Sequence, residues 1–235
     1  MVRDDDIAAL RSLAPFSEMA EENLQELVRA SYLQRFPAMT QLIEEGDRAD
    51  MLHILLDGVV ELYGSFKDRE GTLMIMHPTR AFILAAIVQD LPYLMSARTI
   101  SPARVLMIPA PVAQRLLRAD SAFNDAMMRA LAEEFRRVLK ALKSHKLRDG
   151  TERIAAYFLE LRHNNADADV VKLPADRKTI ATYLGMTREN LSRSFQTVRE
   201  HGATVRGNEI HFRDIDKLRL LAYPSRLIDD LDPGE

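Results

Sequence analysis

The feature that most constrains the fold is residues 121–147, a long run that contains neither Gly nor Pro. In SAFNDAMMRALAEEFRRVLKALKSHKL, apolar residues recur at alternating intervals of three and four positions. These intervals place them along one side of an α-helix, as in helices that pair through a seam. A helix packed on its own domain is the alternative, but the other faces of this segment are strongly charged. We therefore predict a homodimer. The predicted seam residues are Met128, Leu131, Phe135, Val138 and Leu142, and His145 continues the spacing.

The region before this helix has the pattern of a small antiparallel β-structure. Between about residue 32 and residue 108, short apolar runs alternate with turn signals at Gly46-Asp47, Asp57-Gly58 and Gly71. Evenly punctuated short strands are typical of a roll or a jelly-roll-like barrel. Ahead of them, residues 7–31 are predicted to be helical, with Leu24, Leu27 and Val28 on one face.

The region after the long helix predicts a winged helix-turn-helix. Arg148-Asp149-Gly150 breaks the helical pattern, and two further helices follow, the second beginning after Asp176. A turn at Gly185 leads into a third helix, and two short strands joined by Gly207-Asn208 form a hairpin. A last helix starts after Asp214, and the acidic tail IDDLDPGE, residues 228–235, is expected to fray.

These segments define an α+β chain of three parts. We predict an N-terminal antiparallel β-roll over residues 1–119, a dimerisation helix over 120–147 and a winged helix-turn-helix over 148–235.

The composition excludes several classes of function. The chain has a net charge of −3, so any attraction for a polyanion must be local. Residues 176–213 provide it, because they contain seven Arg or Lys and four Asp or Glu. The chain has no Cys, which excludes disulfides, thiolate catalysis and the usual ligation of an iron–sulfur cluster. The sequence also carries none of the common enzyme motifs.

We predict a cytoplasmic protein. The N-terminus, MVRDDDIAAL, is acidic and lacks the apolar run of a secretory signal. The longest apolar run, residues 81–88, is too short to cross a bilayer, so no membrane partner is expected.

The stretch GMTRENLSRSF, residues 185–195, carries the side chains expected of a base-reading helix. One face presents Arg188, Glu189, Ser192 and Arg193, and apolar residues such as Leu191 lie on another. Arg suits the two acceptors of guanine, and Glu accepts from the amino group of cytosine. We predict that this face binds double-stranded DNA. The candidate contact residues are Arg188, Glu189, Ser192, Arg193, Thr187, Lys178 and Arg199.

At this point the chain resembles a known family. RENLSR at 188–193, preceded by TIATYLGMT at 179–187, is similar to the recognition helix of the Crp–Fnr superfamily of bacterial transcription regulators. The resemblance covers almost the whole chain, because GD at 46–47, LHILLDGVVELY at 52–63 and TERIAAYFLEL at 151–161 follow the family's order. It implies a cyclic-nucleotide-binding-like roll, a dimer on a palindromic operator and RNA polymerase as a partner.

The resemblance also implies residue roles. Glu189 would read cytosine and Arg193 guanine, and Arg188 matches an additional guanine reader of the cyclic-AMP-responsive branch. Ser192 completes the Glu-x-x-Ser-Arg signature of the Fnr-like branch, whose half-sites resemble TTGAT. Because this helix combines both features, both kinds of half-site stay open.

The sensor region departs from the family's cyclic-nucleotide pattern. That branch has a Gly-Glu pair and an Arg before Ser-Ala, whereas this chain has Leu84-Ala85 and Met95. A buried phosphate without its Arg is costly, and Arg98 would replace it only with a shifted backbone. We predict that cyclic AMP does not bind in the family's way. The candidate effector residues are Leu84, Ala85, Met95, Ser96 and Arg98.

Three alternatives for the roll stay open: an apolar or planar small molecule, haem, and no ligand at all. Haem would need an axial ligand, for which His53, His77 and His145 are the candidates. No two of these have metal-ligand spacing, so no other metal site is predicted. A cyclic-nucleotide-responsive regulator and a ligand-binding module that acts only through protein contacts are competing functions. The polar face around Arg193 argues against the second.

Overall fold

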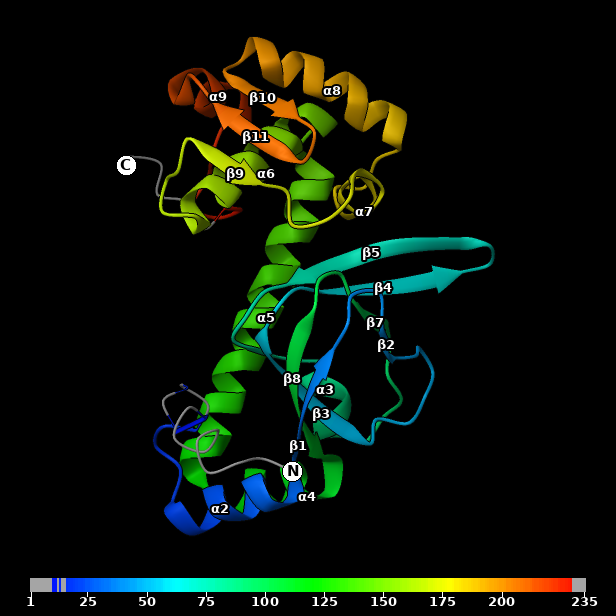
Figure 1. Ribbon diagram of the computed structural model, residues 1–235, viewed down its shortest axis with the longest axis vertical. Helices are drawn as coiled ribbons and strands as arrows, with labels where there is room; N and C mark the ends of the chain where they lie inside the picture. Colours follow the sequence, from blue (N-terminus) through cyan, green and yellow to red (C-terminus); the bar gives the residue numbers. More distant parts are fainter. Residues whose placement is uncertain (1–9, 12, 14–15, 230–235) are drawn as a thin grey trace. The chain divides into compact units, whose positions relative to one another are not determined.

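The computed structural model describes residues 10–11, 13 and 16–229, and the chain divides into two compact units, Met1–Phe135 and Arg136–Glu235. Each unit combines helices with antiparallel strands, as Figure 1 shows. The α+β prediction is therefore confirmed. The predicted long helix, α5 (Ser121–Leu147), is continuous; its first half belongs to the first unit and its last turns to the second.

Two four-stranded antiparallel sheets build the first unit. One has the order β1-β8-β3-β6 and the other β2-β7-β4-β5. Predicted turns are present at Gly46 and at Gly58, which has φ +89° and where a β-carbon would lie 2.4 Å from the carbonyl oxygen of Pro102. The turn predicted to end at Gly71 is formed by Lys67 and Asp68, and Gly71 itself lies in β5. The strands are β1 (Tyr32–Phe36), β2 (Gln41–Ile43), β3 (Met51–Asp57), β4 (Val60–Phe66), β5 (Arg69–Met76), β6 (Arg80–Phe82), β7 (Ser96–Thr99) and β8 (Ala103–Pro109).

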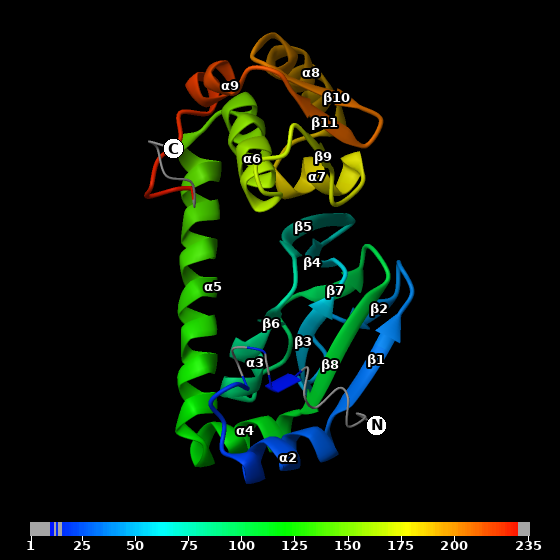
Figure 2. The same cartoon turned by 60° about the vertical axis from the view of Figure 1, so that its left-hand side comes forward.

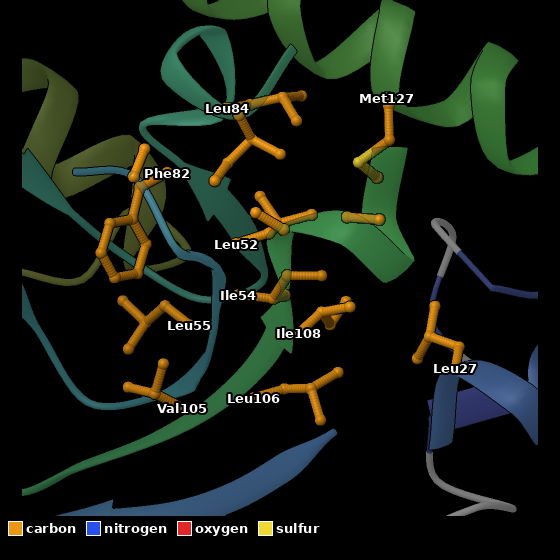
Figure 3. Close-up of a cluster of buried hydrophobic side chains, with 14 of the residues drawn as sticks. Leu27, Leu52, Ile54, Leu55, Phe82, Leu84, Val105, Leu106, Ile108 and Met127 are labelled. Carbon is orange, nitrogen blue, oxygen red and sulfur yellow. The ribbon is translucent and has the colours of Figure 1, made fainter. Parts of the chain in front are cut away.

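The core of this unit joins strands β3 and β8 to the surrounding helices. Leu52, Ile54 and Ile108 are fully buried there, and Met127 of α5 lies in the same cluster (Figure 3). Burial of such side chains stabilises a domain by roughly 1.5–3 kcal/mol each. The helices of the unit are α2 (Glu21–Ala30), α3 (Leu84–Gln89), α4 (Ala110–Ala119) and the start of α5.

The helix predicted over residues 7–31 is interrupted: residues 10 and 11 are helical, but α2 begins only at Glu21. Asp120 accounts for this start: its carboxylate accepts from the backbone N–H of Ala20 at 3.0 Å and from the amide of Asn23 at 2.8 Å. Residues 16–19 form turns that bury Phe16, and residues 7–9, 12, 14 and 15 lie outside the described part of the chain.

In the second unit, helices α7 and α8 are joined by a tight turn and followed by a β-hairpin, as predicted (Figure 2). The helix that precedes them, α6, starts with a capping box in which Asp149 and Glu152 satisfy each other's backbone N–H groups. The strands form a sheet of order β10-β11-β9. The elements are α6 (Gly150–Asn164), β9 (Val170–Lys172), α7 (Arg177–Tyr183), α8 (Arg188–Glu200), β10 (Ala203–Arg206), β11 (Glu209–Phe212) and α9 (Ile215–Ala222).

The prediction that residues 228–235 fray is wrong for the part that the structure describes. The carboxylate of Asp229 accepts hydrogen bonds from both terminal nitrogens of Arg148, at 2.7 and 2.6 Å. Residues 230–235 lie outside the described part.

No helix in the described ranges is both long enough and apolar enough to cross a membrane.

Candidate nucleic-acid interface

The turn between α7 and α8 depends on Gly185. Its φ is +65°, and the N–H of Met186 bonds to the carbonyl of Ala181 at 2.9 Å, which closes the end of α7. A β-carbon on Gly185 would lie 2.7 Å from the ring of His145, a residue of the last turn of α5. The turn is therefore packed directly against the end of α5.

Helix α8 begins at a capping residue and has one buried edge. The hydroxyl of Thr187 accepts from the N–H of Asn190 at 3.2 Å, which fixes the first turn. Leu191 and Val198 are buried, and the ring of Phe195 packs on Phe158 of α6 with centroids 5.9 Å apart. Helix α8 therefore packs against the rest of its unit through its apolar edge.

The other edge of α8 carries the predicted base-reading residues, and all of them are exposed. The guanidinium of Arg193 donates to the side-chain oxygen of Asn190, a residue that is not among the predicted contacts. The two lie three positions apart, which is the spacing at which helical side chains meet. The exposed predicted contacts of this unit are Arg188, Glu189, Ser192, Arg193, Thr187, Lys178 and Arg199.

Local interactions favour the ionised form of two acidic side chains in this region. The backbone N–H of Glu189, the hydroxyl of Thr187 and two nearby arginines lower the pKa of Glu189 below its ordinary value. The pKa of Asp176, which caps α7, is lowered chiefly by the N–H of Thr179. A carboxylate in this state accepts hydrogen bonds only, which is what the amino group of cytosine requires.

A hollow of about 380 Å³ lies between the start of α7 and α8. The guanidinium of Arg177 stands over the ring of Phe195, 5.6 Å from its centroid, and donates to the carbonyl of Gly207 at 3.4 Å. Arg177 thus links α8 to the hairpin. The lining residues are Asp176, Arg177, Lys178, Arg188, Leu191, Ser192 and Phe195.

The hairpin is the predicted wing. Strands β10 and β11 pair from Ala203 and Phe212 to Arg206 and Glu209, and Gly207 turns the chain with φ +58°. Arg206 is exposed beside the turn. Arg177 and Arg206 are not among the predicted contact residues, although the sequence places them beside the start of α7 and the wing turn.

Four of the five predicted seam residues are exposed on α5. Met128, Phe135, Val138 and Leu142 are between 48% and 64% exposed, which is high for large apolar side chains. Leu131 differs, because it is half-buried and packs against the core of its own unit.

The candidate effector residues do not all lie in the same surroundings. Leu84 is buried in the core and Met95 packs against it, whereas Ala85 is exposed on α3. Ser96 is buried, and its hydroxyl accepts from the N–H of Glu45 at 2.9 Å.

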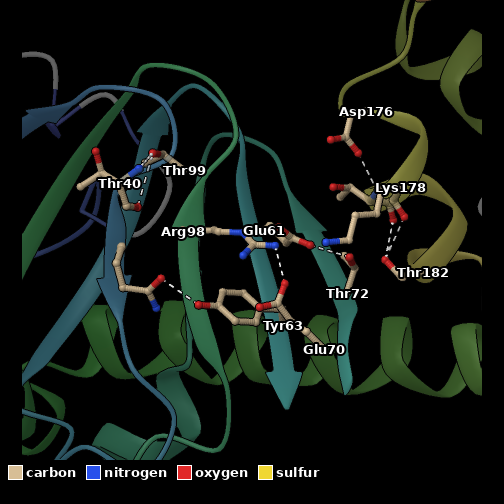
Figure 4. Close-up of polar contacts among 12 residues, drawn as sticks. Thr40, Glu61, Tyr63, Glu70, Thr72, Arg98, Thr99, Asp176, Lys178 and Thr182 are labelled. Atoms are coloured by element: carbon tan, nitrogen blue, oxygen red, sulfur yellow. Dashed lines mark hydrogen bonds and ion pairs between the residues drawn. The ribbon is translucent and has the colours of Figure 1, made fainter. Parts of the chain in front are cut away.

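Arg98 is already paired (Figure 4). Its guanidinium donates to Glu61 and to Glu70, each at 2.7 Å, and stands over the ring of Tyr63, 4.3 Å from the centroid. Burial alone would lower the pKa of Arg98, but these carboxylates raise it above its ordinary value. Thr72 also donates to Glu61, at 2.5 Å, so the Glu61 carboxylate, only 3% exposed, has two partners.

The three histidines named as haem candidates occupy different environments. His53 is buried on β3, stacked on Phe82 with ring centroids 5.3 Å apart, and its Nδ1 has no hydrogen-bond partner. Burial lowers the pKa of His53 from 6.5 to about 4 and also lowers that of His77. His145 lies against Gly185 in the other unit. Across the described residues, no three His, Cys, Asp or Glu side chains gather in a cluster able to hold a metal ion.

Comparisons with known proteins agree with this architecture. Residues 33–120 match the cyclic nucleotide-binding domain, and residues 152–221 match the Crp-like helix-turn-helix domain. The transcriptional activator protein FnrL of Cereibacter sphaeroides is 26% identical over 234 residues, which are 96% of this chain and 92% of that protein. The CRP-like cAMP-activated global transcriptional regulator of Mycobacterium tuberculosis is 24% identical over 189 residues, 78% of this chain and 84% of the relative.

Among solved structures, FixK2 from Bradyrhizobium japonicum shares the fold, with a TM-score of 0.73 at 20% identity; the match covers 83% of this chain and 98% of that one. The matched families and relatives are transcription regulators rather than enzymes, as the sequence predicted. The roll, the helix-turn-helix with its exposed polar edge, and the matches to both family domains show that the chain belongs to the Crp–Fnr superfamily of bacterial transcription regulators.

Proposed function

We propose that this regulator is a cytoplasmic homodimer that binds a palindromic operator through helix α8 and contacts RNA polymerase. The observation that carries the proposal is the two-sided character of α8. Its apolar edge is buried through Leu191 and Val198, while Arg193 and Glu189 are exposed at the end of the helix where this motif meets base edges.

Three side chains of α8 account for the proposed sequence specificity. Arg193 and Arg188 each offer two parallel donors to guanine, and the ionised Glu189 accepts from cytosine. Ser192 and Arg199 of α8, Thr187 at its start and Lys178 in the first turn of α7 add contacts to base edges or phosphates. Two copies joined along α5 would present two α8 helices to half-sites about one helical turn apart.

The exposed apolar side chains of α5 support the dimer. A single exposed Leu or Val needs no explanation, but Phe135, Val138 and Leu142 recur at seam spacing along one helix. In this arrangement residues 1–119 form the sensor, 120–147 the dimerisation helix and 148–235 the DNA-binding part.

The roll is proposed not to bind cyclic AMP in the family's way. Met95 occupies the position of the phosphate-binding Arg and packs against the core, so no cation is supplied there. Arg98 would have to leave Glu61 and Glu70 before pairing with a phosphate, which would strand a buried carboxylate. Three alternatives for the roll remain: it binds an apolar ligand, it binds haem through His53 or His77, or it binds no ligand.

Two measurements test the proposal. Selection of the purified full chain on randomised duplex DNA is expected to yield a two-fold symmetric sequence, and an unstructured or absent consensus would contradict DNA reading. Calorimetric titration with cyclic AMP is expected to give no stoichiometric binding at micromolar concentration. Micromolar, stoichiometric binding would overturn the proposal for the roll.

A further inference from the structure

The segment that follows α9 folds back onto the last turns of α5 (Figure 2, red). Its own turn is closed by Ser225, whose carbonyl accepts from the N–H groups of Ile228 at 2.9 Å and Asp229 at 2.7 Å. The N–H of Ser225 in turn donates to the carboxylate of Asp229 at 2.7 Å. The segment therefore has a defined conformation up to Asp229.

Two lysines of α5 hold the backbone of this segment. Lys143 donates to the carbonyl of Leu227 at 2.9 Å, and Lys140 donates to the carbonyl of Asp229 at 3.0 Å. Both lysines lie in the part of α5 that belongs to the second unit. The C-terminal segment is thus attached to the same stretch of helix that leads into the DNA-binding part.

Arg148 is the centre of the attachment, and it lies at the junction between α5 and α6. Both of its terminal nitrogens bond to Asp229, and one also donates to the carbonyl of Tyr223 at 3.2 Å. The side chains of Arg148 and Asp229 are only 6% and 11% exposed. A two-pronged ion pair of this kind has a fixed geometry, and removing one partner leaves the other charge buried.

The junction is also connected to the turn before the reading helix. The carbonyl of Arg148 accepts from Arg153 at 2.6 Å, and Nε of Arg153 donates to the carbonyl of Leu184 at 3.0 Å. A continuous series of hydrogen bonds therefore runs from Asp229 through Arg148 and Arg153 to the α7–α8 turn.

We propose that residues 223–229 form a strap, with Asp229 as its clasp, that fixes the direction of α8 relative to the end of α5. The inference rests on the proposed function, since that direction sets the separation of the two α8 helices in a dimer. The strap thereby determines which half-site spacing the dimer accepts. Arg148 and Asp229 act as positioning residues and do not touch DNA.

The test compares Asp229→Asn with Asp216→Asn, which removes the same charge from an exposed position on α9. In the full chain without DNA, hydrogen exchange at the amides of Arg148 and residues 184–186 is expected to accelerate about tenfold or more in Asp229→Asn only. The double variant Arg148→Asp/Asp229→Arg, which reverses the pair, is expected to recover part of the protection. If these amides exchange in Asp229→Asn at the same rate as in the wild type, the proposal that residues 223–229 form a strap is overturned.

A second readout uses the operator selected by the wild type, with one base pair added or removed between its half-sites. The wild type is expected to lose about tenfold in affinity on the altered spacing, and Asp229→Asn to lose much less. Mere destabilisation would weaken both operators equally, so equal spacing penalties in the two proteins would overturn the role in spacing. If the wild type selects no sequence, the proposed function fails, and the exchange measurement still decides whether the strap holds the junction.

Discussion

The imidazole of His145 lies where a side chain on Gly185 would have to be, 2.7 Å from the position of its β-carbon. Gly185 also has φ +65°, which an L-residue with a β-carbon adopts at a cost of roughly 1–2 kcal/mol. The last turn of α5 and the turn before α8 are therefore in direct contact.

The first prediction concerns this contact. Gly185→Ala should lower the unfolding free energy of the second unit by more than the conformational cost alone, because the methyl group also displaces His145. Gly207→Ala is the matched control, since Gly207 has φ +58° but open space around it. Urea denaturation of both variants measures the difference, and an equal loss would show that His145 does not constrain the turn.

The second prediction concerns pH. Burial lowers the pKa of His53 from 6.5 to about 4, so the unfolded chain binds a proton that the folded roll does not. The resulting stability is complete above pH 6.5 and is lost as pH falls from 6.5 towards 4, by ~3 kcal/mol in all. His53→Phe, which keeps a ring beside Phe82, should flatten this dependence in urea denaturation. His163→Gln, at an exposed position, should leave the slope unchanged, and a persistent slope in His53→Phe would assign it to other groups.

The third prediction concerns the ion pair of the roll. Arg98→Met should destabilise the first unit by about 3 kcal/mol, because the Glu61 carboxylate stays buried without its cation. Adding Glu61→Met should restore much of the loss, since both charges are then gone. Thermal unfolding of the single and double variants checks this. A double variant no better than Arg98→Met would mean that the two residues do not act as a pair.

The fourth prediction concerns assembly. Val138→Glu places a charge in the proposed seam of α5 and should convert the proposed dimer to a monomer, because the buried charges would lack partners. Arg136→Glu lies about 160° around the helix, at roughly 100° per residue, and should stay dimeric. Analytical ultracentrifugation distinguishes them, and a Val138→Glu dimer as tight as the wild type would place the interface elsewhere.

Local signals in the sequence predicted much of this molecule. The continuous helix α5, the Gly207-Asn208 hairpin and the cap at Asp176 each depend on a few neighbouring residues, and all are present. The exposed edge of α8 also follows from helical spacing alone.

The features that local signals did not predict depend on residues far apart in the chain. Arg98 pairs with Glu61 across 37 positions, and Arg148 pairs with Asp229 across 81. An acidic tail is predicted to be solvated and frayed as long as its basic partner is not known, and for Asp229 that partner is the distant Arg148. In the same way, the start of α2 is set by Asp120, about a hundred positions away.

The central claim is that Arg193 reads a base. The most direct measurement is the affinity of Arg193→Ala for the selected operator and for a scrambled duplex, with Arg29→Ala, an exposed change on α2, as control. We predict that Arg193→Ala loses roughly 1–3 kcal/mol of binding free energy on the operator and little on the scrambled duplex, while Arg29→Ala matches the wild type on both. An equal loss on the two duplexes, or none on the operator, would contradict it.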